Sequence, residues 1–427
     1  MNLMLSAICE RTESSVRAAS AWASAGLLLF YANHGLSWLG QVQGLRRLFL
    51  TAVPPKDAAV VLPELRELRL TEFRIGNPDV GRMAPQLEAL HVHIPSVGEE
   101  ELGLDHLLSL EFKGVGIWRR QEAGLPWELH ELFTAHLERW LPCLCRLVGA
   151  DALPIGPGGD YNLAALPRTL RRLTLSPTTL TNGEQLLHAQ LPNLEELHSY
   201  GRTSLCMEHW AAGMDTFGAA LRKLSYTALP RHDLPAPSPG RLQCLEELCL
   251  TRGTLEELPA WVGTLPRLRS LAVRESSVRR LFATAEECLP LLEKLDLSHC
   301  EELEELPSWV ACLPRLRVLH VGKAALRGAL SSGERPAWAG CLAMLRLGSD
   351  YRTGMQGLGW IGHLQQVRIL DLTSAALLPD DEPAEGGLQQ LVELNLSRCT
   401  GVEEVPAWVW RLPNLRVCTA NSIGRPL

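Results

Sequence analysis

Leucine recurs along the chain in the spacing L-x-x-L-x-L, with variable and mostly polar residues between. The last three positions of each copy alternate apolar, variable, apolar, which is typical of a short strand with one buried face. A second apolar set lies in the connection after each strand, where prolines favour turns over long helices. The pattern therefore predicts many equivalent short strands joined by irregular connections.

Sixteen units of this pattern cover the chain from about residue 45, at steps of mostly 20 to 27 residues. Their first residues are Leu45, Leu65, Leu87, Leu107, Leu144, Leu170, Leu194, Leu221, Leu245, Leu268, Leu292, Leu316, Leu342, Val367, Leu391 and Leu415. This period is that of leucine-rich repeats, in which equivalent side chains stack from coil to coil. We therefore expect an α/β solenoid, a leucine-rich repeat horseshoe of about sixteen coils with a parallel concave sheet and an irregular or short-helical convex side.

A longer period marks every second unit in the later part of the chain. A tryptophan stands seven residues before the first position of four alternate units, at Trp261, Trp309, Trp360 and Trp408. Modules of two coils, about 49 residues apart, follow from this spacing. The flanking Val and Leu residues favour buried tryptophan spacers between coils, and an exposed tryptophan ladder for a partner is the alternative.

The stretches Leu258-Pro259-x-Trp261-Val262 and Leu297-Ser298-His299-Cys300 resemble the leucine-rich repeats of intracellular plant resistance receptors and Shoc-2-like scaffolds. The resemblance covers the repeat region only, and it implies recognition of protein partners without catalysis. It also places Cys300 and Cys399 in a buried ladder as structural thiols. Seven other units carry different residues at this ladder position, so we expect irregular turns there.

The ends of the chain depart from the repeat. Residues 18–45 contain no Asp, Glu, Lys or Arg, and we expect residues 1–44 to form an apolar, helical cap on the first coil of a repeat domain spanning 45–427. A secretory signal or membrane anchor in residues 18–45 is the alternative. At the other end the chain stops in the middle of a coil, which suggests a truncated product or an edge that a partner covers.

The step between Leu107 and Leu144 is 37 residues. Within it, apolar residues recur at helical spacing from Leu129 to Trp140, so we expect a helical insertion at about 115–141. It forms either the longer outer side of one repeat or a protrusion that contacts a partner.

Composition narrows the function classes. The 83 leucines against 8 isoleucines agree with one side chain repeated at equivalent positions. A net charge of −7 without a basic tail argues against a nucleic-acid partner. The 12 cysteines are scattered nearly singly, which favours reduced thiols and a cytoplasmic location.

Motifs for chemistry are absent or incomplete. The sequence holds no phosphate-binding G-x-x-x-x-G-K-[ST] motif, nucleophile elbow, zinc-protease helix or kinase motif set. His91 with His93, and Cys143 with Cys145, lack the companions of a metal site. We therefore expect no cofactor, no metal and no enzyme activity, although a ligase component that recruits substrates remains a distant alternative.

The candidate recognition residues stand at the fifth position of each unit, between the inward leucines. This column reads Phe49, Arg69, His91, Glu111, Val148, Thr174, His198, Ser225, Cys249, Ala272, Asp296, His320, Arg346, Asp371, Asn395 and Thr419. The candidates for partner binding are Arg69, His91, Glu111, His198, Asp296, His320, Arg346, Asp371 and Asn395. Hot spots are expected at Asp296, His320, Arg346 and Asp371, and merely soluble side chains are the alternative.

These patterns together predict a non-enzymatic recognition or scaffold protein that binds a protein partner on the concave face of its solenoid. A membrane-tethered or secreted recognition protein, using residues 18–45, is the alternative.

Overall fold

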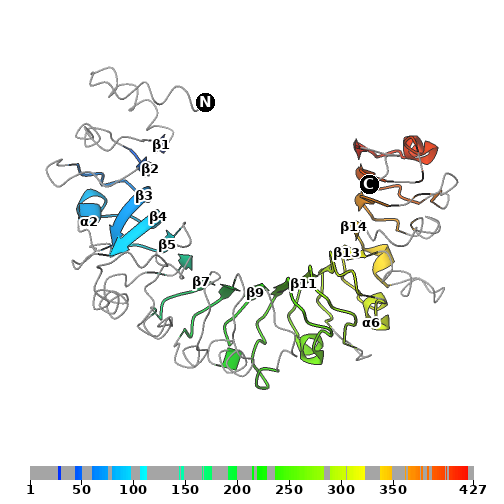
Figure 1. The fold of residues 1–427 in the computed structure, drawn as a ribbon, viewed down its shortest axis with the longest axis horizontal. Coiled ribbons are helices and arrows are strands. Elements are labelled where there is room, and N and C mark those ends of the chain that lie inside the picture. Colours follow the sequence, from blue (N-terminus) through cyan, green and yellow to red (C-terminus); the bar gives the residue numbers. More distant parts are fainter. Residues whose placement is uncertain are drawn as a thin grey trace, which may run out of the picture. The chain divides into compact units, whose positions relative to one another are not determined.

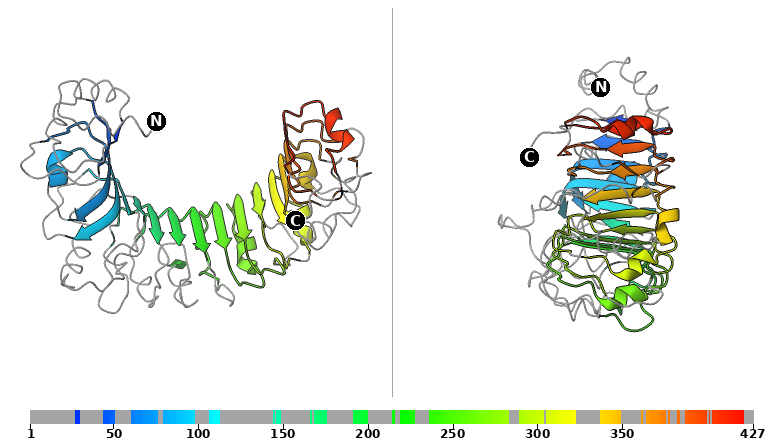
Figure 2. Two further views of the ribbon diagram at one scale, coloured as in Figure 1. Left: turned by 45° about the horizontal axis from the view of Figure 1, so that its top comes forward. Right: turned by 90° about the vertical axis from the view of Figure 1, so that its right-hand side faces the viewer.

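The computed structural model describes residues 27–29, 44–50, 60–75, 79–97, 106–112, 144, 146–148, 166, 168–175, 191–199, 214–215, 219–227, 236–282, 289–303, 305–322, 337–348, 361, 364–375, 377, 382–383, 387–399, 401 and 403–421. The chain forms two compact units, Met1–Ala220 (unit 1) and Leu221–Leu427 (unit 2). Figures 1 and 2 show the strands of each unit side by side.

Unit 1 is built on parallel strands and one short described helix. The elements are β1 (Leu27–Leu29), β2 (Arg47–Leu50), β3 (Glu67–Ile75), α2 (Asp79–Met83), β4 (Ala89–Val97), β5 (Ser109–Phe112), β6 (Arg146–Val148), β7 (Arg172–Leu175) and β8 (Glu196–Ser199). Each strand pairs in parallel with the next one along the chain.

Unit 2 repeats the same arrangement with short helical turns between strands. The elements are β9 (Lys223–Thr227), β10 (Glu247–Thr251), η6 (Ala260–Thr264), β11 (Ser270–Arg274), β12 (Lys294–Asp296), α6 (Ser308–Ala311), β13 (Val318–Gly322), η7 (Ala337–Gly340), β14 (Met344–Gly348), β15 (Ile369–Asp371), β16 (Glu393–Asn395), η9 (Ala407–Arg411) and β17 (Val417–Thr419). Again each strand pairs in parallel with its successor.

Every predicted unit of the repeat has its strand. In all sixteen, from β2 to β17, the strand begins at the third position of the unit. The first residues of the units from Leu45 to Leu391 are buried behind the strands, with Leu65, Leu245 and Leu316 at 0% exposure, whereas Leu415 of the last unit is partly exposed. Identical side chains at equivalent places keep successive coils the same width, so the strands stay in register. The predicted stack of leucine-rich coils with a parallel sheet is confirmed within each unit.

The two-coil module is visible in the backbone. Leu242, Leu289 and Leu388 lie three residues before the first coils of three modules, and each adopts a positive φ between 53° and 59°. The second coils are instead entered through Pro-led helical turns, namely η6 after Pro259, α6 after Pro307 and η9 after Pro406. The first coil at Leu342 is an exception, because the helical turn η7 leads into it. In the other three modules, first and second coils differ in how the chain reaches the strand.

Three expectations concern the ends and the insertion. The predicted N-terminal helix is wrong at Leu27–Leu29, which form β1 and pair with Arg47–Phe49, because the polar edge of β2 recruits an extended neighbour. The remainder of residues 1–43 and the insertion at 115–141 lie outside the described residues. Within the described part of the chain, no helix has the length and apolar character needed to cross a bilayer.

Candidate functional site

Two rows of side chains line the face of each sheet that is turned away from the leucine core. We call this the open face, and it carries the third and the fifth position of each coil, because alternate strand residues point to the same side. In β9, for example, the fourth and sixth positions are buried while the third, fifth and seventh are partly exposed. The residues at these positions are called the third row and the fifth row.

The strand register places the predicted fifth-position residues side by side. In unit 1, Phe49 pairs with Arg69, Arg69 with His91 and His91 with Glu111. In unit 2, the row runs from Ser225 on β9 to Thr419 on β17 without a slip in register. The structure therefore brings the sequence candidates together as one lateral row in each of these stretches.

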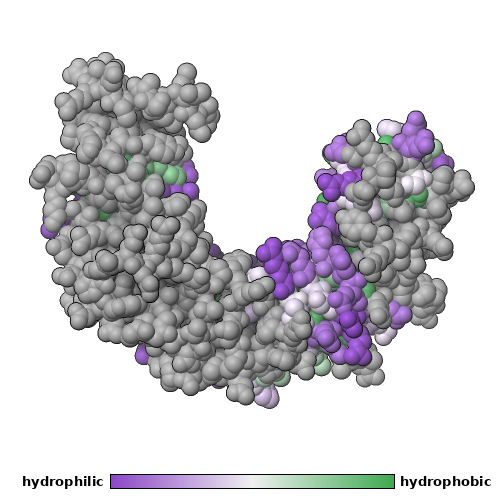
Figure 3. Space-filling model, in the orientation of Figure 1, coloured by the Kyte–Doolittle hydropathy of each residue, from purple (hydrophilic) through white to green (hydrophobic). Residues whose placement is uncertain are grey.

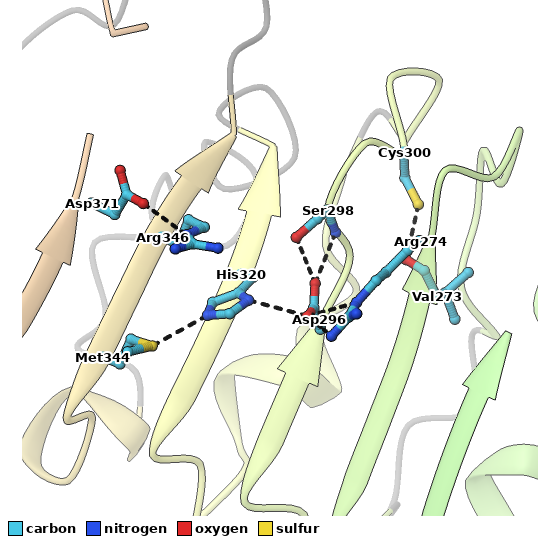
Figure 4. A network of polar contacts seen from close by, with 9 residues as sticks. All are labelled: Val273, Arg274, Asp296, Ser298, Cys300, His320, Met344, Arg346 and Asp371. Carbon is cyan, nitrogen blue, oxygen red and sulfur yellow. Dashed lines mark hydrogen bonds and ion pairs between the residues drawn. The ribbon is translucent and has the colours of Figure 1, made fainter. Parts of the chain in front are cut away.

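Asp296 on β12 is the centre of a polar network in unit 2 (Figure 4). Its Oδ2 accepts hydrogen bonds from Arg274 Nε at 2.8 Å and lies 3.1 Å from His320 Nδ1. Its Oδ1 accepts hydrogen bonds from the backbone N–H of Ser298 at 3.2 Å and from the Ser298 hydroxyl at 2.5 Å. His320 Nε2 in turn lies 3.3 Å from Met344 Sδ. Both carboxylate oxygens of Asp296 are thus occupied within the protein.

The surroundings of Asp296 favour its charged form. Burial by itself would raise the pKa of this carboxyl group. The hydrogen bonds from His320 and Ser298 and the charges of His320 and Arg274 outweigh the burial and hold the pKa below its usual range. Asp296 is therefore a buried, ionised group that fixes the turn after its own strand and binds two neighbouring strands.

Asp371 on β15 repeats part of this arrangement. Its Oδ1 accepts hydrogen bonds from the backbone N–H and the hydroxyl of Thr373, at 3.0 and 2.5 Å, and its Oδ2 accepts one from Arg346 Nε at 2.7 Å. One coil later, Asn395 Oδ1 accepts the backbone N–H of Ser397 at 3.0 Å. An Asp or Asn at the fifth position followed by Ser or Thr at the seventh therefore closes the turn at the end of the strand.

These contacts correct the predicted hot spots. Asp296 is 1% exposed, so the prediction that it contacts a partner directly is wrong; its charge is consumed by Arg274 and His320. His320 and Asp371 are each 8% exposed and bound to their neighbours. Arg346 is different, because its side chain is 53% exposed while Asp371 holds its Nε. Of the four, Arg346 is the side chain best placed to meet another molecule.

A different cluster lies at the start of the fifth row in unit 1. The guanidinium group of Arg69 lies 4.7 Å from the centre of the Phe49 ring, a cation–π arrangement. Arg69 Nη2 is 2.8 Å from Glu67 Oε1, and His91 Nε2 is 3.4 Å from the same oxygen. Glu67 belongs to the third row, whereas the predicted recognition residues stand in the fifth row. In the sequence, Glu67 could have been recognised by the oppositely charged Arg69 two positions later on the same strand.

The remaining candidates occupy the same row with fewer described contacts. Glu111 lies on β5 in register with His91 and Val148, and His198 lies on β8 in register with Thr174. No cluster of three or more His, Cys, Asp or Glu side chains in the described ranges could hold a metal ion. His91 instead lies beside Glu67.

Two of the tryptophans named for structural roles, Trp309 and Trp408, are buried. Trp309 is 3% exposed, stacks on Phe282 with ring centres 4.7 Å apart, and donates its indole N–H to the Phe282 carbonyl at 2.9 Å. Trp408 is 5% exposed and Trp261 is half-buried. The buried-spacer prediction is confirmed for Trp309 and Trp408, whereas Trp360 lies outside the described residues.

Cys300 and Cys399 are buried as predicted. Each thiol donates to a backbone carbonyl of the preceding coil at 3.2 Å, Cys300 to Val273 and Cys399 to Leu372. Burial raises the pKa of the Cys300 thiol to about 11, so it is an inert structural group. Ser276 takes this place in the coil before that of Cys300, where its hydroxyl donates to the Gly253 carbonyl at 3.2 Å.

Sequence reasoning also missed a ladder of charges at the second position of the coils. Each arginine pairs with the glutamate of the next coil at 2.6 to 3.4 Å. The pairs are Arg66–Glu88, Arg171–Glu195, Arg222–Glu246 and Arg269–Glu293. These side chains are largely exposed, so each pair adds little stability, but opposite charges on neighbouring strands favour the observed register.

An open concavity of about 600 Å³ lies beyond the ends of β11 and β12. Figure 3 shows hydrophilic side chains gathered on the surface of unit 2. The lining of the concavity includes Glu275, His299 and Glu302. Glu275 pairs with Arg252 at 2.9 Å and Glu302 with Arg279 at 2.8 Å. Its carboxylates are therefore largely neutralised within the protein.

Comparison with protein-family models gives no match, and comparison with curated proteins gives none. Similar solved structures include the TLR13–ssRNA13 complex, at 15% identity over 94% of this chain and 69% of that one, with a TM-score of 0.49. The Leptospira interrogans LRR protein LIC12759 has 16% identity over 79% and 91%, with a TM-score of 0.38. The plant peptide hormone receptor RGFR1 in complex with RGF2 has 17% identity over 93% and 65%, with a TM-score of 0.42.

The fold of this chain is established by its own strands. Strands β2 to β17 begin at one position of the repeat, pair in parallel in a constant register, and cover a core of stacked leucines. The chain has the leucine-rich repeat fold.

Proposed function

We propose that this chain is a non-enzymatic recognition module that binds a protein partner on the open face of its sheets. The observation that supports this proposal is the register that sets unlike side chains side by side in the third and fifth rows. The inward positions are almost uniformly leucine, whereas neighbouring open-face residues differ in charge and size. Coil stacking needs only the leucines, so the varied rows are available for recognition.

Arg346 is the first residue to test, because it is the exposed member of the predicted hot spots. Proximity labelling with the full chain would identify neighbours, and purified candidates would then be tested for direct binding. The Arg346→Glu variant should lose a direct partner, while Arg315→Glu, an exposed charge outside the two rows, should keep it. Equal binding by both variants, each shown to be folded, would contradict a partner on this face.

We propose a protein partner over a nucleic acid, on the support of the net charge of −7. Single-stranded RNA is the comparison ligand in the binding assay, since one similar structure is an RNA complex. Nucleic-acid binding through phosphate contacts would weaken steeply with salt. Tight RNA binding with such a salt dependence would contradict this part of the proposal.

We further propose a cytoplasmic protein of the intracellular class that the LPxWV motif resembles. In support, none of the seven cysteines within the described ranges forms a disulfide. Fractionation of cells that express the full chain should recover it among cytosolic proteins. Recovery in the alkali-resistant membrane fraction or in the medium would instead favour a tether or signal in residues 18–45.

A further inference from the structure

The third row of unit 2 changes character at three consecutive strands. Val318, Met344 and Ile369 are lateral neighbours on β13, β14 and β15, and all three are partly exposed. We call them the apolar strip. The preceding third-row residues of unit 2 are Lys223, Glu247, Ser270 and Lys294. The three residues of the strip form a continuous apolar surface between polar neighbours in the row. Stacking of the coils does not require this surface, because the inward leucines form the core.

Opposite charges border the strip. Lys294 is the lateral neighbour of Val318, and Glu393 is the lateral neighbour of Ile369. Elsewhere in this row Lys223 and Glu247 pair with each other at 3.0 Å. Among the described residues, Lys294 and Glu393 form no such pair, since the strip holds them apart. The strip therefore has a positive end and a negative end.

The fifth and seventh positions border the strip on one side. In the adjacent fifth row, His320 Nε2 lies beside the Met344 sulfur, and Asp371 anchors Arg346. Beyond that row, the seventh positions of β13 and β14 are Gly322 and Gly348, and a Cβ atom at Gly322 would meet nothing within 4 Å. No side chain therefore stands beyond the fifth row at these two positions, which leaves the row and the strip accessible from that side.

We propose that the apolar strip binds an extended segment of a partner protein that has an acidic and a basic residue about six positions apart and two apolar residues between them. This inference rests on the proposed protein-binding function and names the kind of segment. From β12 to β16 there are four strand spacings, about 19 Å. An extended segment covers this length in about six residues and points every second side chain at the sheet.

Charge complementarity assigns the ends of the segment. Its acidic residue meets Lys294, its basic residue meets Glu393, and the two apolar side chains cover Val318, Met344 and Ile369. The exposed guanidinium group of Arg346 lies one row away, where it can donate to a backbone carbonyl of the segment. The apolar contacts supply most of the affinity, and the two charges select the sequence.

Selection of random heptapeptides on the full chain tests this assignment. The enriched sequences should carry an acid and a base at opposite ends, with apolar residues at the third and fifth places. Selection on the Lys294→Glu variant, whose strip has two acidic ends, should shift to peptides with a base at both ends. Enrichment of one unchanged pattern on both proteins would overturn the proposal.

Anisotropy with a fluorescent heptapeptide of aspartate, serine, leucine, serine, leucine, serine and lysine provides the matched comparison. The Met344→Gln variant should weaken binding about tenfold, as expected for loss of a central apolar contact. Val417→Gln changes an exposed apolar residue of the same row outside the strip and should leave binding unchanged. Equal weakening by both variants would overturn the inference.

The outcomes separate the two proposals. If Arg346→Glu abolishes peptide binding but substitutions at Lys294 and Glu393 leave the selected sequences unchanged, the assignment of the segment is wrong and the recognition function of the open face stands. If none of these open-face variants changes binding, both fall. Concentration-dependent dimerisation that Met344→Gln abolishes would assign the strip to a second copy and overturn the inference.

Discussion

The polar clusters of the two units use the same residue types in opposite ways. In unit 1 the carboxylate of Glu67 stands in the third row, reaches Arg69 and His91 across the sheet surface, and is 23% exposed. In unit 2 the carboxylate of Asp296 stands in the fifth row, is 2% exposed and closes the turn through Ser298. The position of an acidic residue within the coil thus decides whether it accepts hydrogen bonds from the turn after its strand or pairs with side chains on the sheet surface.

The largest expected difference between the clusters is in stability. Asp296→Ala removes an acceptor that serves Arg274, His320 and Ser298, and should cost about 2 to 3 kcal/mol of unfolding free energy in unit 2. Glu67→Ala breaks a more exposed cluster in unit 1 and should cost about 1 kcal/mol or less. Hydrogen exchange at β12 and β3 measures each unit separately, and equal losses would refute the contrast.

Acid should also act through Asp296. Its folded-state pKa lies below the usual value of 3.8, so the unfolded chain takes up a proton that the folded chain does not. The stabilisation by the charged group is therefore complete above about pH 4 to 5 and is lost as the pH falls below that range. Urea unfolding followed by tryptophan fluorescence should show the advantage of the wild-type protein over Asp296→Asn shrinking from pH 7 to pH 3. A constant difference would show that the charge is not responsible.

A smaller effect is expected where the turn is kept and only the charge is removed. Asp371→Asn should retain the bonds to Thr373, as Asn395 retains its bond to Ser397, and lose only the attraction to the half-exposed Arg346. The expected cost is about 1 kcal/mol or less. Asp371→Ala also abolishes the turn bonds and should cost about 1 kcal/mol more. Identical urea midpoints for the two variants would show that the turn bonds contribute nothing.

The smallest effect concerns the surface cluster of unit 1. Arg69→Gln removes the stacking on Phe49 and the pair with Glu67, with an expected cost of about 0.5 to 1 kcal/mol. Salt separates the two contributions, since screening weakens the ion pair more than the ring contact. A Phe49→Leu variant that is as stable as the wild-type protein at high salt would show that the ring contact contributes no stability.

The fold could be predicted from the sequence because the repeat is local. One spacing of leucines sets the strand, the buried face and the step to the next coil, so each of the sixteen units has its strand, from β2 to β17. The burial of Trp309 and Trp408 was predictable from the apolar residues beside them, and that of Cys300 from the ladder position that the family resemblance implies. The strand at Leu27–Leu29 was not, because pairing with β2 decides its conformation against helical spacing.

The candidate site was only partly predictable because exposure depends on residues a coil away. Asp296 and Arg346 look alike in the sequence as charged fifth-position residues, yet Arg274 and His320 bury one and leave the other exposed. The apolar strip did leave a signal in the sequence, since Val318, Met344 and Ile369 are third residues of consecutive units. The predicted recognition residues all stand at the fifth position, so the strip was not among them.

The coil entries limit how one stretch of this array changes length. From Leu245 to Leu316, a first coil is entered through a leucine of positive φ, as at Leu242, and a second coil through a Pro-led turn, as at Pro259. The next first coil, at Leu342, departs from this alternation, because the chain enters it through the helical turn η7. Within the alternating stretch, deletion of one coil would join two entries of the same kind, whereas removal or duplication of a pair restores the junctions. Gene duplication and protein engineering can therefore change the length of that stretch most simply in steps of two coils.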